Sequence, residues 1–451
     1  MKFLKAKYSD LFRELIHSYY NGSFKEKLTA VLADKNINRE ELAQVISSLC
    51  GVELSFSENY EDQLIKSIKN YELSHKVVNK VKVCSMECTG GEGRTKCQES
   101  CPFNAIYIDK EKHTSYIDAD KCTDCGLCVD ACPTGSILDK VEFLPFANLL
   151  REKVPIIAAV APAITGQFGD KVSIYKLRSA FKKIGFTDMV EVAFFADMLT
   201  LKEAVEFDEH VHAKEDFMIT SCCCPMWVAM IKRIYNDLVK HVSPSVSPMI
   251  AAGRVMKHLN SKCKVVFIGP CIAKKAEAKE KDLLGDIDYV LTFSELKDIF
   301  ETLNIKPEEL EEDFSTEYAS KGGRLYARTG GVSIAVGDAI EKLFPGKYSL
   351  LQAAQANGVM ECKKVLSDAQ QGIIKANFIE GMGCIGGCVG GPKAIIPANA
   401  GKAKVDAFAL SSEIKVAVDS ECMNKILNEL KIHSAEDFKH RERIEIFERN
   451  F

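Results

Sequence analysis

Hydrophobic residues recur with a helical period over the first part of the chain. In YSDLFRELIHSYY, FKEKLTAVLADK, REELAQVISSL and EDQLIKSIKNYEL, apolar residues stand three and four positions apart, which places them on one face of a helix. Residues 1–82 are therefore predicted to form a small helical N-terminal domain. Its one cysteine, Cys50, has no ligand partner nearby in the sequence, so a packing or docking role is expected there.

The pattern changes twice further along the chain. Residues 83–145 combine closely spaced cysteines with short strand and turn signals, which predicts a compact α+β domain. From residue 146 to 451, β-branched runs such as PIIAAVAPA, DMVEVAFF, DFMITS, CKVVFIGP and DIDYVLTF alternate with helical stretches. This alternation predicts an α/β domain of parallel sheets flanked by helices. The final stretch, SECMNKILNELKI followed by SAEDFKHRERIEIFERN, is predicted to be charged surface helix.

Composition excludes several classes of protein. The chain has 451 residues, of which 47% are hydrophobic and 27% charged, as expected of a globular protein with two or three domains. Its formal net charge of −4 leaves no basic excess for phosphates, so no nucleic-acid partner is expected. The longest strongly apolar run, residues 154–164, is about half of the roughly 20 residues that cross a bilayer, so no membrane association is expected.

Cysteine is unusually frequent, with 18 residues. A disulfide framework would need export, and the charged first residues do not form the apolar core of a signal peptide. A cytoplasmic location is therefore expected, with reduced thiolates acting as metal ligands.

Eight cysteines between residues 84 and 132 fall into two similar motifs. The second is Cys-x2-Cys-x2-Cys-x3-Cys-Pro, and the first is a stretched version of it. In such motifs three thiolates bind one 4Fe-4S cluster while the fourth, before proline, reaches the other cluster. This predicts a two-cluster ferredoxin-like domain; a pair of zinc sites is the alternative. The first cysteine set comprises Cys84, Cys88, Cys97 and Cys132, and the second set comprises Cys101, Cys122, Cys125 and Cys128.

Three more cysteine loops follow predicted strands in the α/β domain. DFMITS runs into Cys222–Cys224, CKVVFIGP runs into Cys271, and a glycine-rich loop holds Cys384 and Cys388. Strand ends and helix starts favour thiolates through backbone N–H groups and the helix dipole, and α/β folds place their sites there. These loops predict a third metal site.

The three loops resemble the motifs of the FeFe-hydrogenases, written roughly as TSCCPxW, PCxxKKxE and ExMxCxxGCxxGG. Here they stand as SCCCPMW at 221–227, PCIAKKAE at 270–277 and EGMGCIGGCVGG at 380–391. They occur in this order after the ferredoxin-like motifs, so the resemblance covers about residues 84 to 400. The triple cysteine looks most like the clostridial-type group often called group B.

The resemblance implies an H-cluster, which is a 4Fe-4S cube joined through one cysteine to a two-iron unit with carbon monoxide, cyanide and azadithiolate. The central cysteine set of Cys224, Cys271, Cys384 and Cys388 would hold the cube, and Cys388 would bridge to the two-iron unit. Lys274 would face a cyanide, an anionic acceptor that suits an ammonium donor; the alternative is a solvated helix face for Lys274 and Lys275. The other side chains implied beside the two-iron unit are Pro162, Ala163 and Met382.

The activity implied is reversible reduction of protons to H2, with electrons from reduced ferredoxin or flavodoxin entering through the two ferredoxin-like clusters. Maturation proteins are the further partners implied, and oxygen-sensitive metal sites favour an anaerobe's cytosol. The implied proton relay consists of Cys223, Glu203, Ser243 and Glu206. The two glutamates stand three apart on a predicted helix, so they share one face; a surface pair is the alternative. His210, one turn further, is the suggested water-side end.

Several positions depart from the family pattern. Cys222 stands where the family has serine, either as a packed thiol or as a modifier of oxidation. Met249, Gly269 and Ala163 replace other residues near the site, where neighbours tune redox potential and catalytic bias. A sensory hydrogenase, a non-catalytic iron–sulfur assembly factor and a simple electron-transfer protein stay open as alternatives. The remaining thiols, expected to be structural, are Cys50, Cys263, Cys362 and Cys422.

Overall fold

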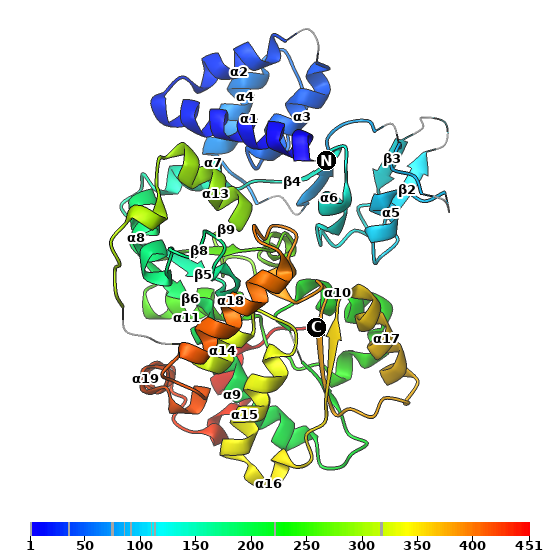
Figure 1. Ribbon diagram of the computed structural model, residues 1–451, viewed down its shortest axis with the longest axis vertical. Helices are drawn as coiled ribbons and strands as arrows, with labels where there is room; N and C mark the ends of the chain where they lie inside the picture. Colours follow the sequence, from blue (N-terminus) through cyan, green and yellow to red (C-terminus); the bar gives the residue numbers. More distant parts are fainter. Residues whose placement is uncertain are drawn as a thin grey trace.

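A computed structural model describes residues 2–34, 37–73, 76–84, 86–90, 93–109, 111, 114–220, 222–315 and 319–451. Three regions follow one another along the chain: N-terminal helices, a small region of short strands, and a large body of sheets and helices (Figure 1). This arrangement matches the fold class expected from the sequence.

The N-terminal region is helical, as its hydrophobic period predicts. Its four helices are α1 (Lys2–Asn21), α2 (Phe24–Leu32), α3 (Arg39–Leu49) and α4 (Tyr60–Lys69). The Asn38 side chain caps α3 by accepting hydrogen bonds from the backbone N–H groups of Glu40 and Glu41, which satisfies donors that have no partner in the first turn. Leu15 and Leu28 are fully buried. Helix α1 also lies against α13 (Phe293–Thr302) of the large body, so this region is packed onto the rest.

The ferredoxin-like region is built from two antiparallel strand pairs and two short helices. Strand β1 (Val78–Lys80) pairs with β4 (Ile137–Asp139), and β2 (Ile106–Asp109) pairs with β3 (Thr114–Ile117). Helices α5 (Lys96–Ser100) and α6 (Leu127–Ala131) follow cysteine-rich loops and lie against each other. The pseudo-repeat seen in the sequence is therefore also a repeat of local structure.

The large body contains two parallel sheets. One has the strand order β6-β5-β8-β9 and the other the order β10-β11-β7. The strands are β5 (Ile156–Val160), β6 (Asp188–Glu191), β7 (Met218–Ile219), β8 (Lys264–Gly269), β9 (Tyr289–Thr292), β10 (Ala353–Asn357) and β11 (Phe378–Met382). The predicted parallel sheet is confirmed, but DMVEVAFF splits: its strand ends at Glu191 and a helix begins at Val192.

Helix α9 (Val192–His210) runs through the middle of this body, between α11 (Pro248–Leu259), α14 (Lys321–Leu325) and α15 (Gly331–Leu343). Every residue from Val192 to Phe207 is buried, as expected of a helix covered on all sides. The other α-helices of the body are α7 (Phe143–Leu149), α8 (Ile174–Ile184), α10 (Pro225–Ile234), α12 (Ala273–Glu277), α16 (Pro345–Tyr348), α17 (Val359–Gln370) and α18 (Ala398–Ser411). Of the helices described, none combines the length and apolar character needed to cross a membrane.

The C-terminal segment corrects one expectation. Helix α19 (Glu421–Glu429) forms, but the charged stretch after it is not a surface helix: it consists of short turns, including α20 (Arg441–Ile444), and an extended end. The Val246 N–H donates to the Phe447 carbonyl at 2.8 Å, and the Arg449 N–H donates to the Pro244 carbonyl at 2.9 Å. Phe447 is fully buried, and burial of this apolar residue holds the segment against the body.

Candidate functional site

The loops that carry the predicted site all follow carboxyl ends of parallel strands. Strand β5 leads to Pro162 and Ala163, β7 to Cys222–Cys224, β8 to Cys271, and β11 to Cys384. Ligand sites of parallel α/β sheets lie at such ends. In this body the loops of both sheets contribute to one internal site. Ser221, the first residue of the triple-cysteine motif, lies outside the described residues.

The central cysteine set is brought together in the interior. The Gly383 N–H donates to the Cys224 Sγ at 3.4 Å, which ties two of the loops. Burial raises the pKa of Cys271 to about 11 and that of Cys388 to about 12, and the neighbouring Cys224 adds to both. Burial raises the pKa of Cys384 well above its usual value, and the nearby thiols of the other three cysteines raise it further. Four thiols that repel one another's negative charge suit a shared cationic metal group, which would hold them deprotonated.

A pocket that is partly open to solvent adjoins this set. Most of its wall is apolar, including Pro162, Ala163 and Met249, and polar side chains are few. Those polar groups are Cys223, Lys274, Tyr326 and Cys388. A largely apolar pocket lined by cysteine and by a buried ammonium has the kind of groups that suit a two-iron unit with anionic ligands. Met382 does not line this cavity; it is buried in a neighbouring apolar cluster that Cys223 and Cys224 contact.

Lys274 and Lys275 are both buried, so the alternative of a solvated helix face is wrong. Lys274 pairs with Glu277 at 2.5 Å; burial lowers its pKa, but the Glu277 carboxylate outweighs burial and leaves the pKa raised. Lys275 pairs with Asp139 at 2.9 Å and with Glu295 at 2.5 Å. Lys274 therefore presents a charged ammonium to the cavity, whereas Lys275 joins this loop to strand β4 of the ferredoxin-like region.

The predicted relay residues lie along one side of α9. Cys223 lines the cavity, and Glu203 and Glu206 are buried on α9, so the surface alternative for the glutamates is wrong. The Thr220 hydroxyl donates to Glu203, and the Ser243 hydroxyl donates to the Glu206 carboxylate at 2.6 Å. Burial raises the pKa of Glu203 to about 8, which suits a group that gains and loses a proton near neutral pH.

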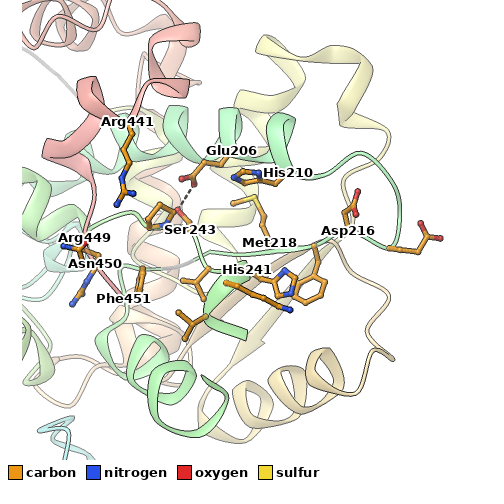
Figure 2. A pocket seen from close by; sticks show the side chains of 16 residues that line it. Glu206, His210, Asp216, Met218, His241, Ser243, Arg441, Arg449, Asn450 and Phe451 are labelled. Atoms are coloured by element: carbon orange, nitrogen blue, oxygen red, sulfur yellow. Dashed lines mark hydrogen bonds between the residues drawn. The ribbon is translucent and has the colours of Figure 1, made fainter. Parts of the chain in front are cut away.

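The relay ends at a surface pocket, called here the entrance pocket. Figure 2 shows Ser243 bonded to Glu206 on one wall and His210 beside them. The C-terminal residues Arg449 and Phe451 form part of the opposite side. His210 therefore stands where the suggested water-side end was expected.

The ferredoxin-like region holds its eight cysteines in the two predicted sets. All four cysteines of the second set line one small pocket. In the first set, burial raises the pKa of Cys97, and the nearby thiols of Cys88, Cys132 and Cys84 raise it further. In the part of the chain that is described, no three His, Cys, Asp or Glu side chains are close enough to bind a single ion. Thiols around a cavity fit a cluster better than the zinc alternative, whose ligands stand about 2.3 Å from one ion.

The second cysteine set lies next to the central set. The Cys125 thiol lies near those of Cys271 and Cys384: Cys271 adds to the raised pKa of Cys125, and Cys125 adds to the raised pKa of Cys384. Gly126 has φ of +79°, and a Cβ on it would lie 2.6 Å from the Ile272 Cβ. The absence of a side chain at Gly126 therefore lets Ile272, next to Cys271, pack directly against the ferredoxin-like region. This approach places the loop of the second set against the loop that carries Cys271.

Several polar groups near the site could not be identified from motifs. Tyr326 lines the cavity. Lys202 contacts Glu206, which lies one turn further along the same helix. Glu448, from the C-terminal segment, reaches the same lysine.

Fold and site together define an iron–sulfur protein with a third, internal cysteine centre. Residues 154–392 match the family model described as iron only hydrogenase large subunit, C-terminal domain. Residues 81–136 match the model described as 4Fe-4S dicluster domain. The chain belongs to the iron-only hydrogenase large-subunit family.

Relatives in this family include hydrogenases and proteins of iron–sulfur assembly. Iron hydrogenase 1 of Clostridium pasteurianum is 27% identical over an alignment of 390 positions, which covers 66% of this chain and 68% of that protein. A homologue of a cytosolic Fe-S cluster assembly factor from Schizosaccharomyces japonicus is 31% identical over 113 residues, 22% of each chain. A solved FeFe-hydrogenase structure on stepwise H-cluster assembly is 22% identical, with a TM-score of 0.56 over 68% of this chain and 97% of its own. These likenesses support a hydrogenase-like fold.

Proposed function

We propose that this chain is an FeFe-hydrogenase that interconverts protons and H2 with electrons from ferredoxin or flavodoxin. The observation that carries the proposal is the largely apolar pocket beside the central cysteine set, lined by Cys223, Lys274 and Cys388. When bound there, a two-iron unit would supply the open metal position at which H2 forms or splits. An electron-transfer protein without this activity leaves such a cavity without a use.

The residues of this chain would then have separate roles. The central cysteine set would hold a 4Fe-4S cube, with Cys388 shared between the cube and the two-iron unit. Lys274 would orient an anionic ligand while its pairing with Glu277 keeps the ammonium charged. The apolar wall, including Pro162 and Ala163, would exclude water. Met382 is proposed as a residue behind this wall.

Protons would move between the entrance pocket and Cys223 through Glu206, Ser243 and Glu203. Transfer needs groups that alternately hold and release a proton in an interior where a free charge is costly. The bonds of Ser243 with Glu206 and of Thr220 with Glu203 hold these carboxyl groups in fixed orientations. Electrons would enter through the two cysteine sets of the ferredoxin-like region, the second set being next to the central one.

The finer assignment follows the triple cysteine and is also proposed. It comprises the clostridial-type group B, a cytoplasmic location in an anaerobe, and maturation proteins that deliver the two-iron unit. The domain division proposed is 1–82 for the helical domain, 83–145 for the ferredoxin-like domain and 146–451 for the catalytic domain.

The second candidate is an iron–sulfur assembly factor without a two-iron unit, favoured by the kinship with such factors. A sensory hydrogenase is a third candidate, suggested by Met249 in the cavity wall. The pocket argues against the assembly factor, because a protein without a two-iron unit has no need for a buried ammonium and a thiol that face a largely apolar space.

The test is maturation of the full chain with the two-iron cofactor, followed by infrared spectroscopy and an H2 assay with a reduced low-potential dye. Carbon monoxide and cyanide bands with H2 evolution are expected. Cys223→Ala should keep these bands and lower turnover by at least about 100-fold, in line with the loss of an acid–base group. Cys222→Ser, at the neighbouring thiol, is the matched control and should keep turnover.

Two outcomes would overturn the proposal in favour of the alternatives. About twelve irons per chain, as in three 4Fe-4S clusters, without carbon monoxide or cyanide bands after maturation would favour the assembly factor. Full bands with very slow turnover in the wild type would favour the sensor.

A further inference from the structure

Lys202 is a fully buried lysine that no motif of the family accounts for. It lies on α9 directly before Glu203, and its ammonium contacts the Glu206 carboxylate. It also donates to the Ser245 hydroxyl at 3.2 Å and lies 3.5 Å from the Glu448 carboxylate. A buried ammonium is costly unless paired, and here it is paired with two carboxylates.

Glu448 reaches this lysine because the C-terminal segment is built into the body. The backbone of Ser245 pairs with that of Glu448 in an antiparallel bridge. The main-chain bonds described above hold residues on both sides of that bridge. On its outer side the Glu448 carboxylate pairs with Arg441 at 3.1 Å. The segment therefore places one specific carboxylate against the lysine from outside, while Glu206 approaches it from the helix.

The two oxygens of Glu206 have different partners. One contacts the Lys202 ammonium, and the other accepts the hydrogen bond from the Ser243 hydroxyl. Ser243 also bonds to Ser245 at 2.8 Å, and Ser245 in turn accepts from Lys202. The two serines and the two charged groups therefore form a closed ring, in which Lys202 holds one oxygen of the Glu206 carboxylate and Ser243 holds the other.

We propose that Lys202 and Glu448 are positioning residues that set the charge state and orientation of Glu206, and that residues 444–451 are a working part of the proton entrance. This inference rests on the proposed function for its consequence in catalysis. The effect of Lys202 and Glu448 on Glu206 involves only groups of this chain and does not depend on whether the chain forms H2.

The two positioning residues act on Glu206 with opposite signs. The Lys202 cation favours the ionised carboxylate, so Lys202→Met should raise the pKa of Glu206. Glu448 competes for the same ammonium and adds negative charge, so Glu448→Gln should lower that pKa. A general loss of packing would not move one group in opposite directions. The other charged or titratable groups on the elements around Glu206 are Glu203, His210, Asp216, Cys222, Lys240, His241, Arg441 and Arg449.

The direct test is an infrared pH titration of carboxyl groups in the full chain loaded with its 4Fe-4S clusters but not with a two-iron unit. The spectrum of Glu206→Gln, subtracted from the wild type, assigns the Glu206 band. Lys202→Met should move its midpoint up by about one pH unit or more, and Glu448→Gln should move it down. Lys202→Arg should restore the wild-type midpoint. Equal midpoints in wild type, Lys202→Met and Glu448→Gln, or shifts of the same sign, would overturn the inference.

The second readout is the pH profile of H2 turnover in the matured protein. Lys202→Met should lower turnover about 10-fold to 100-fold and shift the acid limb upward, while Glu448→Gln should shift that limb downward. Should Lys202→Met not fold, Glu448→Gln alone decides by the direction of its shift. If the wild type forms no H2 but the two variants shift the carboxyl midpoint in opposite directions, the proposed function is rejected and the positioning role is kept. If the wild type forms H2 but the variants show no such shifts, the proposed function is kept and the positioning role is rejected.

Discussion

The Tyr326 hydroxyl lies 2.9 Å from the Thr200 hydroxyl, at the wall of the cavity that adjoins the central cysteine set. Thr200 also donates to the carbonyl of Ala196 at 2.9 Å. Since a threonine hydroxyl has one proton, Tyr326 must be the donor in the shared bond. The direction of this bond leaves the tyrosine oxygen able to accept a second hydrogen bond from a group nearby.

This direction predicts unequal costs for the two substitutions that break the bond. Tyr326→Phe removes the donor and leaves Thr200 bonded to Ala196, so the loss should be about 1 kcal/mol. Thr200→Val removes the acceptor and leaves a buried tyrosine hydroxyl without a partner, which should cost about 1–3 kcal/mol. Anaerobic thermal unfolding of both variants measures the order. A lower unfolding temperature for Tyr326→Phe than for Thr200→Val would contradict the assigned donor.

Glu203 predicts a pH dependence of stability. Burial raises its pKa from 4.5 to about 8, so the folded protein keeps this proton over a range in which the unfolded chain has lost it. A raised pKa gives stability that is fully present below the unfolded value of 4.5 and is lost as pH rises through the folded value of about 8. The slope from this one group should approach about 1.4 kcal/mol per pH unit.

Glu203→Gln removes that dependence. Denaturant unfolding between pH 5 and pH 8, a window of about three units in which the linkage acts, should show a flatter loss of stability in the variant than in the wild type. Glu26→Gln in the N-terminal helices, where the carboxylate lies on an exposed position, is the control and should keep the wild-type slope. Parallel slopes for wild type and Glu203→Gln would show that Glu203 ionises normally.

The sequence allowed a prediction of which cysteines lie together, as the second set does around one pocket, because the ligand geometry of a cluster is encoded in short spacings. Even the exchange of Cys101 and Cys132 between sets followed from the proline after each of them. The parallel strands were also predictable, since buried strands read as continuous apolar runs. The boundary inside DMVEVAFF was not, because α9 is buried on every side and its first turn, VAFF, has the β-branched and aromatic residues typical of a buried strand.

The groups that could not be predicted depend on contacts between distant segments. Glu448 meets Lys202, and Lys275 meets Asp139, only after separate regions have packed. The charged C-terminal segment was misinterpreted for the same reason. Its arginines and glutamates are typical of a solvated helix, whereas Ile444 and Phe447 are buried and hold it against the body.

The buried pairs of Lys275 predict a large loss of stability on its removal. Lys275→Met would leave the carboxylates of Asp139 and Glu295 in the interior, with Lys393 on Asp139 at 2.6 Å as a remaining partner. Breaking such a buried pair from one side costs about 3–5 kcal/mol. Lys297→Met is the matched control, because its pair with Glu301 at 4.0 Å is exposed and should contribute at most about 1 kcal/mol. Similar unfolding temperatures for the two variants would show that the buried ion pairs of Lys275 contribute no more to stability than the exposed pair of Lys297.

Gly126 predicts a defect confined to the contact between the second cysteine set and the central set. An alanine Cβ there would lie 2.5 Å from the Ile272 Cδ1 and 2.6 Å from its Cβ, in a backbone with φ of +79°. Gly126→Ala should therefore push Ile272 and the adjacent Cys271 away from the ferredoxin-like region. Gly93→Ala separates this effect from backbone strain, because Gly93 has φ of +74° and no atom within 4 Å of the added Cβ.

Both alanine variants should lose about 1–2 kcal/mol from the left-handed backbone. Only Gly126→Ala should also slow electron transfer between the clusters and weaken their magnetic interaction, measured by electron paramagnetic resonance of the reduced protein. An unchanged spectrum in Gly126→Ala would mean that Ile272 gives way without moving Cys271. An equal change in Gly93→Ala would attribute the defect to the cysteine loops themselves, and the close approach at Ile272 would then have no part in electron transfer.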